Sequence, residues 1–201
     1  MTSPRRSGRR PGDSGTREAI LAAARESFAA AGYDATTIRG VGRAAAVDPA
    51  LVHHFFGTKQ DLFVAAMELP IDPAKLLPAV LADGTDGLGE RVVRTFLRIW
   101  DGTPGHNRML ALLRSAASNE QAAAMLREFL SEAILGPVAR AAGHDRPELR
   151  ASLVGSQMMG LAFARYVLRL EPLATAEPNT IASAIGPTVQ RYLTEELPVK
   201  P

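Results

Sequence analysis

The sequence predicts an all-α protein. Apolar residues recur every three or four positions over most of the chain, which is the spacing of one face of an α-helix. Beyond Pro70, no stretch alternates apolar and polar residues as a half-buried strand would. The apolar stretches are separated by segments rich in Gly, Pro and Asp, as is typical of turns between helices: ADGTDG, DGTPG, AGHDRP and EPLATAEP.

The chain opens with the segment MTSPRRSGRRPGDSG, residues 1–15, which is rich in Arg, Ser, Gly and Pro. We expect a disordered basic arm, because this composition offers no apolar surface to bury. From Thr16 the pattern becomes helical, and Gly32 suits the left-handed position that ends many helices. The residues expected to share one face of this first helix are Ile20, Ala24, Phe28 and Ala31.

A second, shorter helix is predicted after Thr36 and Thr37, either of which is a good N-cap. Gly40 and Gly42 each destabilise this helix by about 1 kcal/mol relative to alanine, so the helix depends on packing. The residues expected to point inward are Ile38, Val41 and Ala45. The small residues expected where this helix crosses the next one are Ala44, Ala45 and Ala46.

A third helix is predicted to begin at Pro49, because Asp48 is a good N-cap and a proline at the first helical position loses no hydrogen bond. It should end near Phe55, since Thr58 caps a fourth helix that continues to about Leu69. Two short helices joined by a short turn, and supported by an amphipathic helix before them, form a helix-turn-helix. This arrangement allows one short helix to enter a major groove about 12 Å wide.

Six further helical segments are predicted after Pro70, near residues 73–82, 87–101, 106–117, 119–142, 146–170 and 178–196. The last two are apolar over a wide face. The uncharged run 151–164 is too short and too polar for a membrane span, which needs about 20 apolar residues. We therefore expect a buried helix there and a protein with no membrane partner.

The stretch AGYDATTIRGVGRAAAVDPALVHHFFGTKQDLF, residues 31–63, resembles the DNA-binding domain of the tetracycline-repressor (TetR/AcrR) family of bacterial regulators. The most specific features are Gly-Tyr…Thr-Thr at 32–37, Val47 after the turn, and Leu51…His54…Phe-Gly-Thr-Lys at 56–59, followed by Asp-Leu-Phe at 61–63. The resemblance implies an N-terminal three-helix helix-turn-helix domain and a C-terminal helical bundle for dimerisation and ligand sensing. The expected division is an arm over 1–15, a DNA-binding domain over 16–62 and a sensor domain over 63–201.

The resemblance also implies a set of DNA contacts. Thr37 should bind a phosphate, Arg39 should reach a guanine edge, and Lys59 should hold a phosphate at the start of the fourth helix. The residues expected to face the groove or its border are Pro49, Ala50, His53 and His54. The arginines at 5, 6, 9 and 10 are expected to follow the adjacent minor groove. The chain departs from the family at Ala46, where a glycine is usual, at His53, where a tyrosine is common, and at Phe55, where a histidine is frequent.

A ligand pocket in the C-terminal part is expected from the same resemblance. Its candidates are apolar residues with a few polar ones, which also suit an ordinary core: Phe96, Trp100, Met109, Leu113, Met125, Phe129, Gln157, Met158 and Tyr166. The arginines at 91, 94, 98 and 114 have the spacing of a solvated helix face.

Charge and composition narrow the function classes. Residues 1–60 hold nine basic and five acidic residues, a net charge of +4, whereas the rest of the chain has a net charge of −2. This asymmetry favours a polyanion as partner of the N-terminal part. The absence of cysteine excludes disulfides and thiolate metal sites, and fits a cytoplasmic location. We expect no cofactor. We also expect no metal at His53 and His54, because neighbouring residues on a helix point about 100° apart.

The leading hypothesis is a cytoplasmic, homodimeric repressor that binds a palindromic DNA operator and is released by an unknown small-molecule effector. The helices near 146–170 and 178–196 of two subunits would pack as a four-helix bundle. One alternative is a helical dimeric adaptor or ligand-binding protein without DNA binding. A helical enzyme is a further alternative, although the sequence has no phosphate loop, metal-ligand spacing or nucleophile–base pair.

Overall fold

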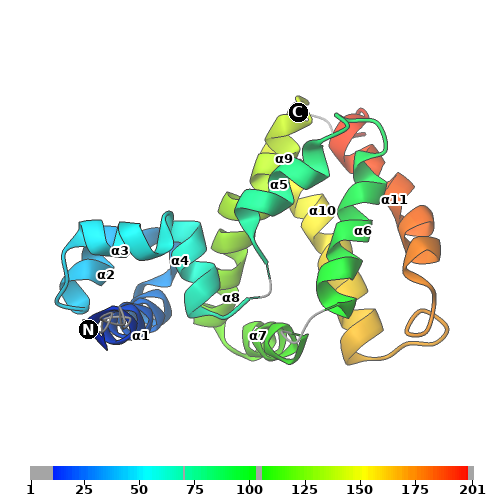
Figure 1. Ribbon diagram of the computed structural model, residues 1–201. Coiled ribbons are helices and arrows are strands. Elements are labelled where there is room, and N and C mark those ends of the chain that lie inside the picture. The colour runs from blue at the N-terminus through cyan, green and yellow to red at the C-terminus, as the bar shows by residue number, and fades with distance from the viewer. Residues whose placement is uncertain (1–10, 70, 103–105, 199–201) are drawn as a thin grey trace, which may run out of the picture.

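The computed structural model describes residues 11–69, 71–102 and 106–198, and within these ranges it contains helices and turns and no strand (Figure 1). The prediction of an all-α fold is confirmed. The N-terminal helices are α1 (Pro11–Ala35), α2 (Ile38–Ala44), α3 (Pro49–Phe56) and α4 (Lys59–Ala66). They are followed by α5 (Pro73–Leu81), α6 (Leu88–Asp101), α7 (His106–Ser118) and α8 (Glu120–Phe129). The π-helical segment η1 (Leu130–Leu135) joins α8 to α9 (Gly136–Ala141), α10 (Pro147–Ala162) continues as the π-helical segment η2 (Phe163–Val167), and α11 (Pro178–Thr194) completes the fold.

Most helix positions agree with those expected from the sequence, and the differences lie at helix ends and at the π-helical segments η1 and η2. The fourth helix ends at Ala66 rather than near Leu69, and residues 168–170 lie beyond the helix expected to reach them. Residues 1–10 of the expected basic arm lie outside the described residues. Residues 11–15 are helical, so the expectation of disorder is wrong for them. A proline in the first turn is compatible with a helix, and the apolar pattern that follows extends it.

The inward face of α1 is made by Ile20, Ala24 and Phe28, which are fully buried. Ala31 was expected on the same face but is exposed. At the next residue, Gly32, a φ of +82° takes the chain out of the helical conformation, and Tyr33 after it is buried in the core. Gly32 was expected to end the first helix; the chain does leave the helical conformation there, but α1 resumes and continues to Ala35.

An aromatic cluster closes the core of the N-terminal helices. The ring of Phe28 lies 4.9 Å from that of Phe63 on α4, and Tyr33 lies 5.2 Å from Phe63. The fourth ring, Phe129, comes from α8 and lies 4.5 Å from Phe63 and 5.6 Å from Tyr33. Figure 1 shows α8 beside α1 and α4, between the N-terminal helices and the rest of the molecule. The N-terminal core is thus completed by a helix of the C-terminal part.

A second apolar core lies among α6, α9, α10 and α11. Helices α6 and α11 approach closely at Gly89, which faces the backbone of Gly186 and Gln190, and at Gly186, which faces the backbone of Glu90. The backbone N–H of Gly89 donates to Oε1 of Gln190 at 2.7 Å. A side chain larger than hydrogen would overlap the neighbouring helix at either glycine.

Two buried arginines stabilise the ends of these helices. Arg150 is only 1% exposed and donates to the carbonyls of Tyr192 and Glu195 at 2.8 and 2.9 Å. It thereby supplies hydrogen-bond donors to carbonyl groups at the C-terminal end of α11. Its remaining nitrogens donate to the carbonyl and the carboxylate of Asp145, both at 2.6 Å. Arg165 donates to the carbonyls of the loop before α11. No helix among the described residues has the length and hydropathy needed to cross a membrane.

Candidate nucleic-acid interface and apolar cavity

Helices α2 and α3 form a helix-turn-helix whose ends are fixed by side-chain caps. The hydroxyl of Thr37 accepts a hydrogen bond from the backbone N–H of Gly40 at 3.0 Å and begins α2. The carboxylate of Asp48 accepts one from Ala50 at 2.7 Å and begins α3. Asp48 was expected as a cap, and Thr37 was one of the two threonines expected to cap α2. Each cap satisfies a backbone N–H in the first turn of a short helix.

The crossing between α2 and α3 occurs at Gly42. A Cβ atom on this residue would lie 3.2 Å from Cα of Pro49 and 3.2 Å from the carbonyl of Val47. The expectation that Ala44, Ala45 and Ala46 fill the crossing is wrong, because Ala44 and Ala46 are exposed and Ala45 is only half-buried. Gly42 weakens the isolated helix but permits the close approach.

Ala46 occupies the turn with a φ of +55°. This left-handed conformation costs a residue with a Cβ about 1 kcal/mol relative to glycine. The turn therefore carries strain at Ala46, the position where the resemblance leads us to expect a glycine.

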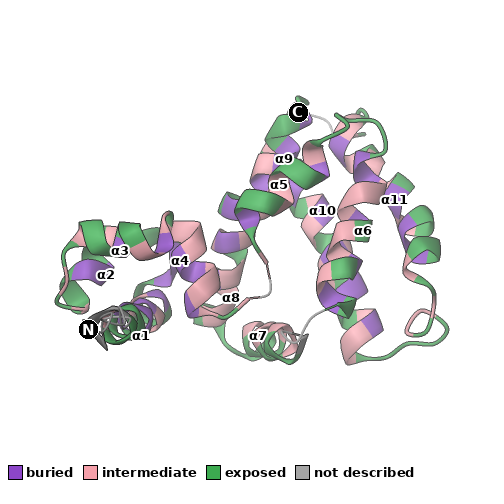
Figure 2. Cartoon of the chain, in the orientation of Figure 1, coloured by how far each residue is buried: buried purple, intermediate pink, exposed green. Residues whose placement is uncertain are grey.

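The outer face of α2 and α3 carries most of the predicted DNA-contact residues. Figure 2 shows this part of α3 largely in the colour of exposed residues. Thr37, Arg39, Ala50, His53 and His54 are exposed, and Pro49 is half-buried. The inner face of α3 is anchored by Val52 and Phe56, which are buried.

One exposed basic residue near this face was missed by the sequence reasoning. Arg43 lies in the last turn of α2 and is exposed. Its charge and its position one turn after Arg39 were the available signals. No group of three or more His, Asp and Glu side chains that suits a metal ion occurs in the described part of the chain.

Lys59 lies at the start of α4, where Thr58 and Asp61 form a reciprocal capping box. Its ammonium group donates to the carbonyl of Asp34 at 3.0 Å and lies 4.4 Å from the ring centre of Tyr33. Burial is the main cause that raises the pKa of Tyr33 to about 12, and nearby carboxylates add to it. Because an ammonium group has three donors, Lys59 retains capacity for a phosphate beside this carbonyl.

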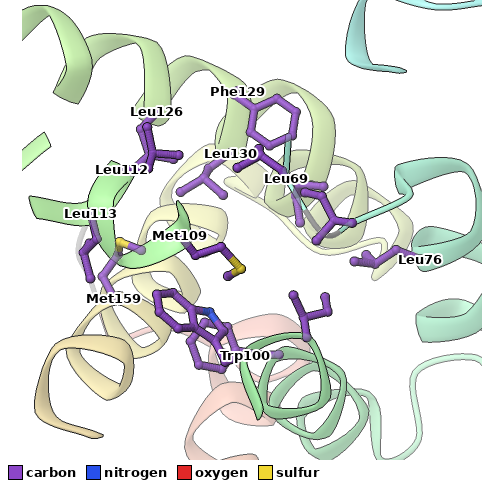
Figure 3. Close-up of a pocket in the computed structure, with 14 residues that line it drawn as sticks. Leu69, Leu76, Trp100, Met109, Leu112, Leu113, Leu126, Phe129, Leu130 and Met159 are labelled. Carbon is purple, nitrogen blue, oxygen red and sulfur yellow. The ribbon is translucent and has the colours of Figure 1, made fainter. Parts of the chain in front are cut away.

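An apolar cavity of about 140 Å³ lies between α6, α7 and α8 (Figure 3). Figure 3 shows Trp100, Met109 and Leu130 directed toward a common space. Its lining residues are Leu69, Ile71, Leu76, Phe96, Ile99, Trp100, Met109, Leu112, Leu113, Leu126, Phe129, Leu130, Ile134 and Met159. A second cavity of about 110 Å³ shares several of these residues and extends toward Val138 and Met158.

Five of the nine residues predicted for the pocket line the first cavity: Phe96, Trp100, Met109, Leu113 and Phe129. Met158 lines the second cavity. Met125 belongs to the N-terminal core instead, and Gln157 is absent from the lining of both cavities. Met159, the neighbour of Met158, lines both.

Tyr166 does not line the cavity but packs against Trp100, which does. Its ring stacks on that of Trp100 at 4.8 Å, and its hydroxyl donates to Asp101 at 2.9 Å. Burial, followed by the interaction with Asp101, raises the pKa of Tyr166 above the ordinary range of tyrosine. The tyrosine thus remains neutral and holds the indole that forms one wall.

The lining residues missed by the sequence reasoning come from many elements. They are Leu69 and Ile71 between α4 and α5, Leu76 on α5, Ile99 on α6, Leu112 on α7, Leu126 on α8, Leu130 and Ile134 on η1, and Met159 on α10. Leu112 adjoins Leu113, and Leu126 and Leu130 lie one turn apart. Their three- and four-residue spacing indicated an apolar face, but it did not indicate which side of each helix meets a cavity.

The walls of the cavity also hold the N-terminal helices through polar contacts. On α8, the carboxylate of Glu128 accepts a hydrogen bond of 3.0 Å from the backbone N–H of Asp34, and the amide of Gln121 donates to the carbonyl of Ala30 at 3.1 Å. On α7, Arg108 forms an ion pair with Glu68, and the second oxygen of Glu68 pairs with Arg25 of α1 at 3.2 Å.

A capped helix-turn-helix with an exposed third helix, joined to a helical domain with an apolar cavity, defines a class of DNA-binding transcriptional regulators. Residues 20–66 match the family model described as bacterial regulatory proteins, tetR family. Residues 86–193, more than half of the chain, match the tetracyclin repressor-like C-terminal domain. The chain belongs to the tetR family of bacterial transcriptional regulators, which are not enzymes.

Solved structures of similar chains include a TetR-family regulator from Streptomyces coelicolor A3, which is 44% identical over 93% of this chain and 99% of that chain, with a TM-score of 0.44. Another is NalD, the secondary repressor of the MexAB-OprM multidrug efflux pump in Pseudomonas aeruginosa. It is 20% identical over 92% of this chain and 100% of that chain, with a TM-score of 0.46. No curated protein sequence matches the chain significantly.

Proposed function

We propose that this regulator is a homodimeric repressor that binds a palindromic operator and is released from it by a small molecule bound in the apolar cavity. The observation that carries the proposal is the position of α8. One side of α8 lines the cavity through Leu126 and Phe129, and Glu128 holds the junction between α1 and α2. A cytoplasmic location follows for a protein whose operator lies on a bacterial chromosome.

The DNA contacts are proposed for the exposed face of α2 and α3. Arg39 reaches a base edge, Ala50 contacts a thymine methyl, and His53 faces the groove. Thr37 and Lys59 bind phosphates on either side, and Pro49 and His54 lie at the border of the contact. Arg43, exposed in the last turn of α2, supplies a further phosphate contact.

The dimer is proposed to form through α10 and α11. Exposed residues follow one stripe along α10 and into η2: Leu149, Ser152, Ser156, Gly160 and Phe163. Leu149 is 38% exposed and Phe163 is 44% exposed, so the stripe has an apolar residue at each end and small residues between them. Small side chains allow a helix of the second copy to approach closely, and the two-fold axis then matches a palindromic operator.

Release is proposed to act through the two contacts that join the cavity walls to the N-terminal helices. A ligand that displaces α7 or α8 moves Arg108 or Glu128, and with them Glu68 or Asp34. Asp34 is held on both sides, since its N–H donates to Glu128 and its carbonyl accepts from Lys59. Thr37, the cap of α2, follows three residues later, so a shift of Asp34 changes the orientation of α2 and α3. To reduce the DNA-binding conformation from 99% to 1% of the protein, the ligand must prefer the other conformation by about 5.5 kcal/mol.

The decisive experiment selects bound fragments from random DNA with the full chain and then measures affinity for the selected sequence. An inverted repeat and a strong salt dependence are expected. Arg39→Ala should weaken binding and relax the preference at one base position, because this arginine is proposed to reach a base edge. Arg140→Ala is the matched control, because Arg140 is an exposed arginine on α9, remote from α3. Selection of no sequence at low salt would contradict the proposal and favour an adaptor without DNA binding.

The dimer is tested separately by sedimentation. Ser156→Arg introduces a large charge in the middle of the stripe and should shift the protein toward monomer. Ser115→Arg places the same residue on an exposed position of α7 and should leave the dimer intact. Equal sedimentation of the two variants would exclude this face of α10 as the interface.

A further inference from the structure

The lining of the two adjoining cavities determines which chemical class of ligand they accept. Their walls consist of aliphatic, aromatic and methionine side chains, to which the second cavity adds Thr95 and Gly155. No charged side chain lines either cavity within the described residues. A carboxylate, ammonium or phosphate group would lose its hydration there without gaining a partner.

Several charged residues on the surrounding helices have partners outside the cavities. Arg108 on α7 pairs with Glu68, and Glu128 on α8 accepts from the backbone of Asp34. On α6, Arg91 donates to the carbonyl of Val80 at 2.9 Å and Arg94 pairs with Glu90. None of these groups is placed to neutralise a charged ligand in the cavities.

The volumes set the size of the ligand. The two cavities measure about 140 and 110 Å³ and have Leu76, Phe96 and Met159 among their common walls. An engineered apolar cavity of about 150 Å³ in another protein holds benzene and stays free of water. The space is therefore sufficient for about two small rings or a short hydrocarbon chain.

We infer that the cavities bind an uncharged, apolar molecule of one or two rings, or a short hydrocarbon, held by dispersion and burial without an ion pair. The inference rests on the proposed function, in which this cavity is the effector site. Burial of the ligand removes apolar surface from water on both sides, and the methionines at 109 and 159 adapt to its shape.

Trp100 supplies a direct readout, because it is the single tryptophan of the chain and lines the cavity. The probes are iodobenzene and 4-iodobenzoate, which share the ring and the quenching iodine and differ by a carboxylate. We expect iodobenzene to quench Trp100 emission saturably and to raise Tm. 4-Iodobenzoate should bind about tenfold more weakly than iodobenzene or worse, because no charged group in the cavity pairs with its carboxylate. Equal or tighter binding of 4-iodobenzoate, or no saturable quenching by iodobenzene, would overturn the inference.

Variants localise the binding. Leu113→Phe fills part of the cavity and should weaken iodobenzene binding severalfold, and Met109→Phe does the same should the first variant fold poorly. Leu170→Phe is the matched control, since Leu170 is 56% exposed and lies outside the lining. Unchanged binding in folded Leu113→Phe and Met109→Phe proteins would also overturn the inference.

The same titrations on the operator complex separate this inference from the proposed function. Binding of iodobenzene at Trp100 that leaves operator affinity unchanged would support the ligand class and contradict the proposed release. Release by 4-iodobenzoate with stronger quenching than iodobenzene would support the release and refute the ligand class.

Discussion

The carboxylate of Glu128 on α8 accepts a hydrogen bond of 3.0 Å from the backbone N–H of Asp34, at the junction between α1 and α2. The adjacent residue Phe129 lines the apolar cavity and also contacts Tyr33 and Phe63. A single turn of helix thus touches the proposed effector site and the start of the helix-turn-helix.

Glu128→Ala should weaken operator binding in the absence of ligand by about threefold to tenfold, because a hydrogen bond of about 1 kcal/mol that orders the junction is lost. Fluorescence anisotropy with a labelled operator measures this change. The matched control is Glu132→Ala, which removes an exposed carboxylate four residues later. If both variants bind as tightly as the unmodified protein, the Glu128–Asp34 contact has no role in presenting α2.

Ala46→Gly should raise the free energy of unfolding by about 1 kcal/mol, because glycine adopts the φ of +55° without the strain that a Cβ causes. Urea unfolding measures the difference. Ala45→Gly, at the neighbouring residue with a φ of −80°, relieves no strain and should be neutral or destabilising. A loss of stability in Ala46→Gly would show that the turn is relaxed with alanine.

Gly89→Ala should lower the free energy of unfolding by about 3 kcal/mol, since the added Cβ overlaps the backbone of Gln190 and Gly186 and must separate α6 from α11. Thermal and urea unfolding measure the effect. Gly15→Ala makes the same change in α1, where no atom lies within 4 Å of the new Cβ. This control should be neutral or slightly stabilising, so that equal losses in the two variants would contradict the close approach.

Stability should fall in acid partly through Asp145. The hydrogen bond from Arg150 is the main cause that lowers the pKa of Asp145 below its ordinary value of 3.8. The unfolded chain therefore takes up a proton at this residue at a higher pH than the folded protein does. The contribution to stability is complete above pH 3.8 and is lost as the pH falls through the lowered pKa. Comparison of urea midpoints at about pH 6 and about pH 3 should show a smaller difference for Asp145→Asn. An equal difference would exclude this carboxylate as a contributor.

The sequence allowed prediction of those features that depend on local chemistry. The caps Thr37, Asp48 and Thr58 and the proline at 49 determined where α2, α3 and α4 begin, because each cap acts on backbone groups within three residues. The residues expected on the exposed face of α3 came from the family resemblance, and Ala50, His53 and His54 are exposed there. For these elements the sequence was a sufficient guide.

Features that depend on how helices pack against one another were harder to predict from the sequence. Gly42 rather than the alanine run forms the crossing, since only the assembled pair shows which residue approaches the other backbone. In the cavity, Met159 has a larger role than the predicted Met158, and Leu126 lines it where Met125 does not. Adjacent residues of a helix point about 100° apart, so a small rotation of the helix exchanges their roles.

The π-helical segments add to this difficulty. The segment η1, Leu130–Leu135, changes the helical phase between α8 and α9, and residues on either side then face different neighbours than a regular 3.6-residue period implies. Residues 119–142 were expected as one helix, and the local propensities gave no sign of this change of phase.

The anchoring of Arg150 bears on how this protein can be engineered. The guanidinium relies on carbonyl oxygens at 192 and 195. A deletion that removes the chain from residue 190 onward would take away both of these acceptors and leave the guanidinium with Asp145 alone, so such trimming is expected to impair folding even though it spares every proposed DNA and effector contact. A fusion partner joined after residue 198 preserves both acceptors and is the safer position for a tag.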